Sequence, residues 1–318
     1  MPIRPNGEKR LSDVITNAVP ATREAEETYV NADERKTGIA HKGVETSWRR
    51  MDDEYLNIVL SAIKVCAEYK PKFGQGSRGG GLTLDQFQGL YRADPLYSWF
   101  GLDNPMMYAA HKTAGGMTSV YRQIGSGCER LFRRVIKDSM DLSDEDTAWS
   151  YQVTLPSGRK RTLYLDGRIP LEKISDVDRR GRFHDWMRES ARMLDVDDSV
   201  FNNLSGTIFE VRQGYKSKDS KRQNADIANA VTAYTKGYFP CAVILSGQID
   251  GDVLMRYRAE KWSVVTGVTG ASNPLISTYD FMREIIGYDL AGFFERNSPT
   301  LKGEIDGILQ SLLEVESK

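Results

Sequence analysis

Apolar residues recur along this chain with two different periods, and each period predicts a different kind of element. From Met51 to Tyr69 and from Thr118 to Met140 they return every three or four positions, which indicates amphipathic helices. Further helices are predicted over approximately Phe183–Leu194, Ser220–Lys236, Asp250–Glu260 and Leu301–Glu314. We place the start of the first helix at Asp52 and Asp53, because acidic residues favour a helix N-terminus.

Strands are predicted where apolar and polar residues alternate, or where a short apolar run is uninterrupted. The segments SYQVTLPSG and RKRTLYLDGRIP alternate around a Pro-Ser-Gly turn, which indicates a hairpin. Thr207–Tyr215 alternates as well. The run Cys241–Leu245 is apolar throughout, which is typical of a strand buried on both faces, and Trp262–Val268 predicts another short strand.

The order of these elements predicts the fold class. From Thr118 the chain reads helix, hairpin, inserted helix, strand, helix, strand, so we expect an α/β core with a mixed central sheet flanked by helices. Residues 1–48 are polar and predict an N-terminal arm, and 49–117 predict helices and loops. The core spans 118–268, and 269–318 predict a helical C-terminal region. We expect 95–117, which is rich in aromatic residues, methionine and glycine, to be packed but irregular.

Composition narrows the possible functions. The chain has 318 residues, a net charge of −1 and an isoelectric point near 6.4, so nucleic-acid binding would have to depend on local basic patches. Its three cysteines are far apart, without a CxxC motif or a nearby histidine, which argues against zinc and against a disulfide framework. No apolar run approaches the ~18 residues of a membrane span. We expect a cytoplasmic protein without membrane contact.

The stretch from Thr207 to Asp226 carries the strongest chemical signal. Its alternating strand contains Glu210, an acid that is costly to bury unless a metal ion or a cation holds it. Ser220 and Gln223 have the spacing of a capping box, so a helix is predicted to begin there. Five cations fall within eleven residues: Arg212, Lys216, Lys218, Lys221 and Arg222. A strand acid, cations and a helix N-terminus together predict binding of a phosphate-rich polymer and of a divalent metal.

Other motifs carry a weaker functional signal. Gly74, Gly76 and Gly79 spell GxGxxG, but no strand precedes them, so we interpret them as a flexible loop that contacts DNA through Arg78. The tetrad that begins at Asp103 only faintly resembles an amino-methyltransferase motif and is dismissed. The three histidines are scattered and support neither a Ser/His/Asp nor a Cys/His arrangement.

Glu210 and Arg212, followed by GYKSKDSKRQNAD, resemble the PD-(D/E)xK nuclease superfamily, and within it the type II restriction endonucleases. The resemblance covers mainly Thr118 to Gly267, about half of the chain. It implies a sequence-specific hydrolase that cuts double-stranded DNA at phosphodiester bonds and uses Mg²⁺. It also implies a homodimer and a cognate DNA methyltransferase as a functional partner.

The resemblance implies a set of site residues. Acids of the second and third core strands bind magnesium in that family, and here they correspond to Asp166 and Glu210. The helix that opens the core often adds a carboxylate, for which Glu129 is the match. The family's lysine position is occupied by Arg212, so either Arg212 stabilises the transition-state charge or Lys216 or Lys218 replaces the lysine. Other aspartates compete with Asp166 for the first position: Asp176, Asp178, Asp195, Asp197 and Asp198.

DNA contacts are expected from several basic elements. The helix from Thr118 contributes Arg122, the glycine-rich loop contributes Arg78, and the helix that begins at Ser220 contributes Lys221, Arg222 and Gln223. The region 49–117 is a candidate for DNA recognition. Two alternative functions remain open: another DNA-processing or phage-defence nuclease, and a non-catalytic DNA-binding protein with a decayed nuclease core.

Overall fold

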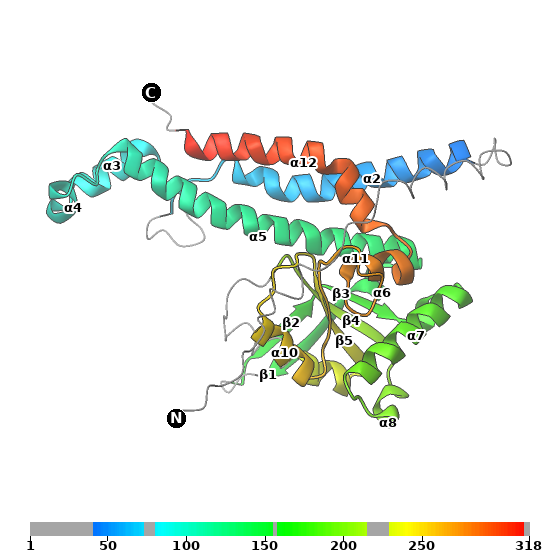
Figure 1. Ribbon diagram of the computed structural model, residues 1–318. Helices are drawn as coiled ribbons and strands as arrows, with labels where there is room; N and C mark the ends of the chain where they lie inside the picture. Colours follow the sequence, from blue (N-terminus) through cyan, green and yellow to red (C-terminus); the bar gives the residue numbers. More distant parts are fainter. Residues whose placement is uncertain (1–40, 73–79, 155–157, 215–228, 315–318) are drawn as a thin grey trace, which may run out of the picture. The chain divides into compact units, whose positions relative to one another are not determined.

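The computed structural model describes residues 41–72, 80–154, 158–214 and 229–314 (Figure 1). The chain divides into two compact units, residues 1–51 and 52–318. Only the start of helix α2 (His41–Ile63) is described in the first unit, so the fold below is that of the second.

Two long helices dominate the described chain, α5 (Pro105–Met140) and α12 (Leu290–Leu313). None of the described helices combines the length and the apolar character that crossing a membrane requires. Other helical elements of the described residues are η1 (Lys64–Cys66), α3 (Leu84–Arg92), α4 (Pro95–Trp99), α6 (Asp144–Thr147), η2 (Leu171–Lys173), α7 (Val177–Met193), α8 (Asp198–Phe201), the stretch 229–235, α10 (Gly251–Ala259), α11 (Thr278–Asp280) and the π-helical turn η3 (Phe281–Ile286).

The strands of the described residues form a mixed sheet and a hairpin. The sheet order is β3-β4-β5-β6, with β3 antiparallel to β4 and with β4, β5 and β6 parallel. The hairpin pairs β1 with β2. Asp166 alone separates β2 from β3. The bounds are β1 (Trp149–Thr154), β2 (Lys160–Leu165), β3 (Gly167–Pro170), β4 (Gly206–Arg212), β5 (Tyr238–Ile244) and β6 (Ser263–Val265). The predicted α/β class with a mixed sheet is therefore confirmed.

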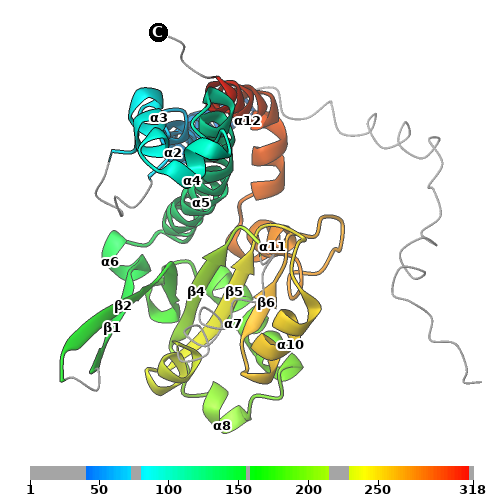
Figure 2. The same cartoon turned by 90° about the vertical axis from the view of Figure 1, so that its left-hand side faces the viewer.

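The sheet is covered by helices on both faces, which is why its central strands are almost wholly apolar. On one face, Ala242 and Val264 pack against Val253 and Tyr257 of α10. On the other face, the ring of Phe209 contacts that of Phe132 in α5, with centroids 5.2 Å apart, and α7 packs through Trp186. Helices α10 and α7 therefore lie on opposite faces (Figure 2). This burial explains the uninterrupted apolar run of β5.

Residues 95–117 are helical, which corrects the expectation of an irregular segment. Asn104 caps α5 by accepting a hydrogen bond from the N–H of Met107, and Pro105 occupies the first helical position. The glycines that contributed to this expectation allow close packing instead. A Cβ at Gly116 would lie 2.4 Å from the side chain of Leu312 in α12.

Helices α2, α5, α7 and α12 all begin earlier than predicted. Helix α7 begins at Val177 because Asp176 accepts a hydrogen bond of 2.9 Å from the N–H of Arg179. Helix α2 runs through Asp52, which instead accepts 2.8 Å hydrogen bonds from Tyr288 Oη and Arg296 Nε. Asp52 is therefore a tertiary contact and does not mark a helix N-terminus.

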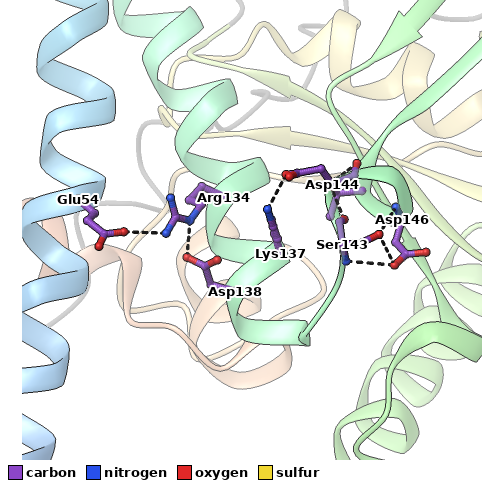
Figure 3. A network of polar contacts seen from close by, with 8 residues as sticks. Glu54, Arg134, Lys137, Asp138, Ser143, Asp144 and Asp146 are labelled. Atoms are coloured by element: carbon purple, nitrogen blue, oxygen red, sulfur yellow. Dashed lines mark hydrogen bonds and ion pairs between the residues drawn. The ribbon is translucent and has the colours of Figure 1, made fainter.

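A polar network holds the C-terminal half of α5 in place (Figure 3). Arg134 pairs with Glu54 of α2 at 2.7 Å and with Asp138 at 2.6 Å. About one turn further on, Lys137 Nζ lies 2.7 Å from Asp144 Oδ1 of α6. Helix α6 begins with a capping box at Ser143. These contacts join α5 to α2 and to α6.

Candidate functional site

Glu210 lies near the carboxyl end of β4 and is almost completely buried, with 6% of its surface exposed. A buried carboxylate requires a compensating charge or hydrogen bonds. The guanidinium of Arg212, two residues further along the strand and also largely buried, forms an ion pair with Glu210 through Nη2 and Oε1. The strand thus presents an acid and a cation on one face, as its alternation predicted.

Asp166 lies beside Glu210 at the junction of β2 and β3. Its backbone N–H donates to the carbonyl of Phe209 at 2.9 Å, and its Oδ2 accepts from the N–H of Val211 at 2.8 Å. These two hydrogen bonds are made with the residues immediately before and after Glu210. The same Oδ2 lies 3.8 Å from Nη1 of Arg212. Arg212 therefore contacts both carboxylates, and the predicted pair Asp166 and Glu210 is brought together at one end of the sheet.

Helix α5 adds a cation that the sequence did not single out. Arg133 is exposed, and its Nε donates a 2.7 Å hydrogen bond to the backbone carbonyl of Asp166. One signal was present in the sequence, because Arg133 lies four residues after Glu129 and so shares its helix face. The contact with Asp166 joins residues 33 positions apart and could not be inferred locally.

Glu129 lies on the stripe of α5 that runs past this end of the sheet. Gly125, Glu129 and Arg133 are spaced by four residues and share one face. At one end of the stripe a Cβ on Gly125 would be 3.8 Å from Gln213, just beyond β4, and at the other end Arg133 holds Asp166. Glu129 is half-buried.

The carboxylates do not form a ready-made metal cage. Among the described residues, no three or more His, Cys, Asp or Glu side chains make a group that could hold a metal ion. The grouping that the structure places together is the pair Asp166 and Glu210 with Arg212. A metal role for Glu129 therefore stays a prediction.

Tyr151 is a further neighbour of Glu210. The hydroxyl of Tyr151, on β1, donates to Oδ1 of Asn229 in the helical stretch 229–235. Burial raises the pKa of Tyr151, and the negative charge of Glu210 raises it further, against a lowering by a hydrogen bond with Thr232. Tyr151 is therefore a neutral donor near Glu210. The hairpin pattern predicted its strand but gave no indication of this neighbour.

The competing aspartates lie elsewhere. Asp176 and Asp197 cap α7 and α8, and hydrogen bonds from Arg179 and from Ser199 respectively lower their pKa. All five competitors are exposed: Asp176, Asp178, Asp195, Asp197 and Asp198. The segment that leads into α7 bonds to the start of β4, where the N–H of Leu171 donates to the carbonyl of Ser205, so α7 begins at the end of the strand opposite to Glu210.

The predicted DNA-contacting residues lie partly on α5 and partly outside the described residues. Arg122 is exposed on α5 and its Nη2 lies 3.4 Å from Ser119 Oγ. The glycine-rich loop and most of the basic stretch after β4 lie outside the described residues. The predicted site residues there are Arg78, Lys216, Lys218, Lys221, Arg222 and Gln223.

Comparisons of the chain with protein-family models, with curated proteins and with solved structures found no match.

Proposed function

We propose that this protein is a Mg²⁺-dependent, sequence-specific endonuclease of double-stranded DNA, of the type II restriction class. The observation that carries the proposal is the meeting of Asp166 and Glu210, with Arg212 in contact with both. In the nuclease superfamily that the sequence resembles, an acid of the second strand and an acid of the third strand bind the metal, and a cation follows two residues later.

The chain order supports the proposal. Helix α5 is followed by the hairpin β1-β2, and the chain continues past Asp166 into β3, which pairs with β4. A helical stretch then leads to β5, parallel to β4. Asp166 thus stands where the second core strand changes its partner from β1 to β4, and Glu210 stands on the third.

The donor set fits magnesium. Mg²⁺ prefers oxygen ligands, usually takes only one or two carboxylates from the protein, and completes its shell with water and substrate phosphate. Asp166 and Glu210 would hold the ion. When bound, it would supply polarisation of the phosphoryl group and a water of lowered pKa.

Arg212 serves the same site as a permanent cation. Its guanidinium stays protonated, so it cannot take a proton from water. Its contacts with both carboxylates lower their mutual repulsion. Near a phosphodiester its charge would stabilise the negative charge that grows during hydrolysis.

The second candidate function is DNA binding without cleavage. The observation in its favour is that Arg212, where the family has lysine, already pairs with Glu210. A decayed nuclease core could use this pair to stabilise the fold alone.

Incubation of the purified protein with phage DNA of known sequence separates these functions. We expect discrete bands in Mg²⁺, and intact DNA in EDTA or in Ca²⁺. A smear would indicate a non-specific nuclease. Intact but retarded DNA in all three conditions would favour the second candidate, and DNA that is neither cut nor retarded would reject both.

We expect Arg212→Met to lower the cleavage rate by about a hundredfold while DNA affinity in Ca²⁺ changes only a few-fold. A group that acts on the transition state changes the rate constant more than ground-state binding. Single-turnover cleavage and fluorescence anisotropy measure the two quantities. Arg212→Lys, which retains the charge, should recover part of the rate. A variant that loses only affinity would remove Arg212 from catalysis.

We expect Arg133→Ala to weaken DNA binding and to flatten the slope of log affinity against log salt by about 0.9, the effect of one lost phosphate contact. Arg133 is exposed beside Asp166 and is anchored there by its Nε alone among the contacts that the structure describes. The matched control is Arg192→Ala, which removes an exposed arginine of α7 paired with Glu189. Equal slopes for both variants and the wild type would contradict a phosphate contact.

A further inference from the structure

Large apolar side chains are concentrated at one place on the described surface. Of the 17 large hydrophobic residues that are exposed there, 6 lie between residues 90 and 106. They lie on α3, on α4 and the residue after it, and at the start of α5, at the end of α5 that points away from the sheet (Figure 1). Trp99, Phe100 and Met106 are 82%, 76% and 80% exposed. We call this surface the apolar tip: Leu90, Leu96, Tyr97, Trp99, Phe100 and Met106.

The charges of this segment are engaged within it. Asp94 accepts hydrogen bonds from the N–H groups of Leu96 and Tyr97, and Asp103 pairs with Arg92 at 3.1 Å. Residues 93–107 contain no lysine or arginine. A nucleic acid requires cations opposite its phosphates, so the apolar tip is not suited to DNA. Exposed apolar patches of this kind mark protein interfaces, which are rich in aromatic residues and methionine.

The same surface contains a recess. A pocket of about 500 Å³ is lined by Leu90, Tyr91, Ala93, Asp94, Pro95 and Tyr97. Stacked rings form part of its wall: the ring of Tyr97 stacks on Tyr91, which stacks in turn on the buried Phe87. Pro95 and Trp99 are four residues apart on α4 and share one face. A protruding indole therefore stands beside a recess large enough to receive one.

A protrusion beside a matching recess is self-complementary. In a twofold association the same patch is used by both copies, so the Trp99 of each can enter the recess of the other. The six side chains of the apolar tip are uncharged and bring no charge repulsion between identical copies. An aromatic side chain can bury 150–250 Å², so six partly exposed large side chains offer on the order of 700 Å² per copy, close to the ~800 Å² of a stable interface.

We propose that the apolar tip is the interface through which two copies of this chain associate. The inference does not depend on the proposed nuclease function, since it uses no residue of the site at β4. It assigns a surface to the homodimer that the sequence suggested only through a family resemblance.

The test measures the mass of the full chain by light scattering after gel filtration, over protein concentrations from about 1 to 100 µM, the range of a micromolar Kd. We expect the wild type to form dimers as concentration rises. Trp99→Asp combined with Phe100→Ser should remain a monomer throughout. Met255→Glu, which changes an apolar residue of α10 that is 65% exposed, is the matched control and should behave as the wild type.

Folding is checked by thermal unfolding at the lowest protein concentration, where dimerisation adds little stability. Both changed side chains are exposed, so the midpoint should not fall there. If the double variant does unfold, Met106→Glu tests the same surface from α5. A wild type that stays monomeric over the whole range, or tip variants that dimerise like the wild type, would overturn the proposal. The apolar tip would then belong to a different protein partner.

Discussion

Glu210→Ala is expected to lower DNA cleavage by a thousandfold or more, while the protein still folds and binds DNA. Removal of a metal ligand deletes stabilisation of the transition state, and a thousandfold corresponds to about 4 kcal/mol in activation free energy. DNA binding should persist or improve, because the change removes a negative charge that would face phosphate. Single-turnover cleavage in saturating Mg²⁺ and anisotropy in Ca²⁺ measure the two effects.

Two controls separate a loss of catalysis from a loss of folding. Arg212 keeps Asp166 as a counter-charge in the variant, so folding should survive, and thermal unfolding checks it. Glu189→Ala removes an exposed glutamate of α7 that pairs with Arg192, and should cut DNA like the wild type. Cleavage by Glu210→Ala within tenfold of the wild type would exclude Glu210 from the metal site.

The second large effect is expected at Asp166, where two substitutions separate chemistry from structure. Its carboxylate accepts the N–H of Val211, a residue with no exposed surface. Asp166→Ala leaves that buried N–H without its acceptor, which should cost about 1–3 kcal/mol of folding stability. Asp166→Asn retains an acceptor oxygen, so we expect near-normal stability. Both variants should lose at least a hundredfold in cleavage, because neither carries the charge that Mg²⁺ requires.

Thermal unfolding and single-turnover cleavage together decide the role of Asp166. Asp176→Ala is the control, because Asp176 competes for the same role from sequence but caps α7. It should unfold slightly earlier and cut DNA normally. Cleavage by Asp166→Asn at the wild-type rate would mean that Asp166 has only a structural role, as the acceptor for the N–H of Val211.

Local pattern was a sound guide to the existence and type of an element where burial imposes a clear period or an uninterrupted apolar run. The hairpin β1-β2, the buried strand β5 and helix α10 follow directly from period and composition. Local pattern failed at 95–117, where small and aromatic residues suggested irregular packing. There the helix is stabilised by a neighbour, since the glycine at 116 receives the side chain of Leu312 from almost 200 residues away.

The site residues also divide into those that local pattern predicted and those whose contacts only the structure revealed. Glu210 and Arg212 could be singled out because an acid and a cation on one face of an otherwise buried strand are local facts of the sequence. Asp166 was selected through a family resemblance, and the structure places it beside Glu210 by hydrogen bonds across 45 residues. The contact of Arg133 with Asp166 was missed, since it depends on the rotation of α5.

The sequence by itself determined the α/β class, the order of the core elements and the strand that carries the central acid and cation, because burial imposes its period on neighbouring residues. Only the tertiary structure decided which aspartate meets Glu210, that Arg212 contacts both acids, and that α5 brings Arg133 to the same end of the sheet. It also decided that the aromatic residues near Trp99 face outward. These are contacts, or the absence of contacts, between distant segments, and no local period records them.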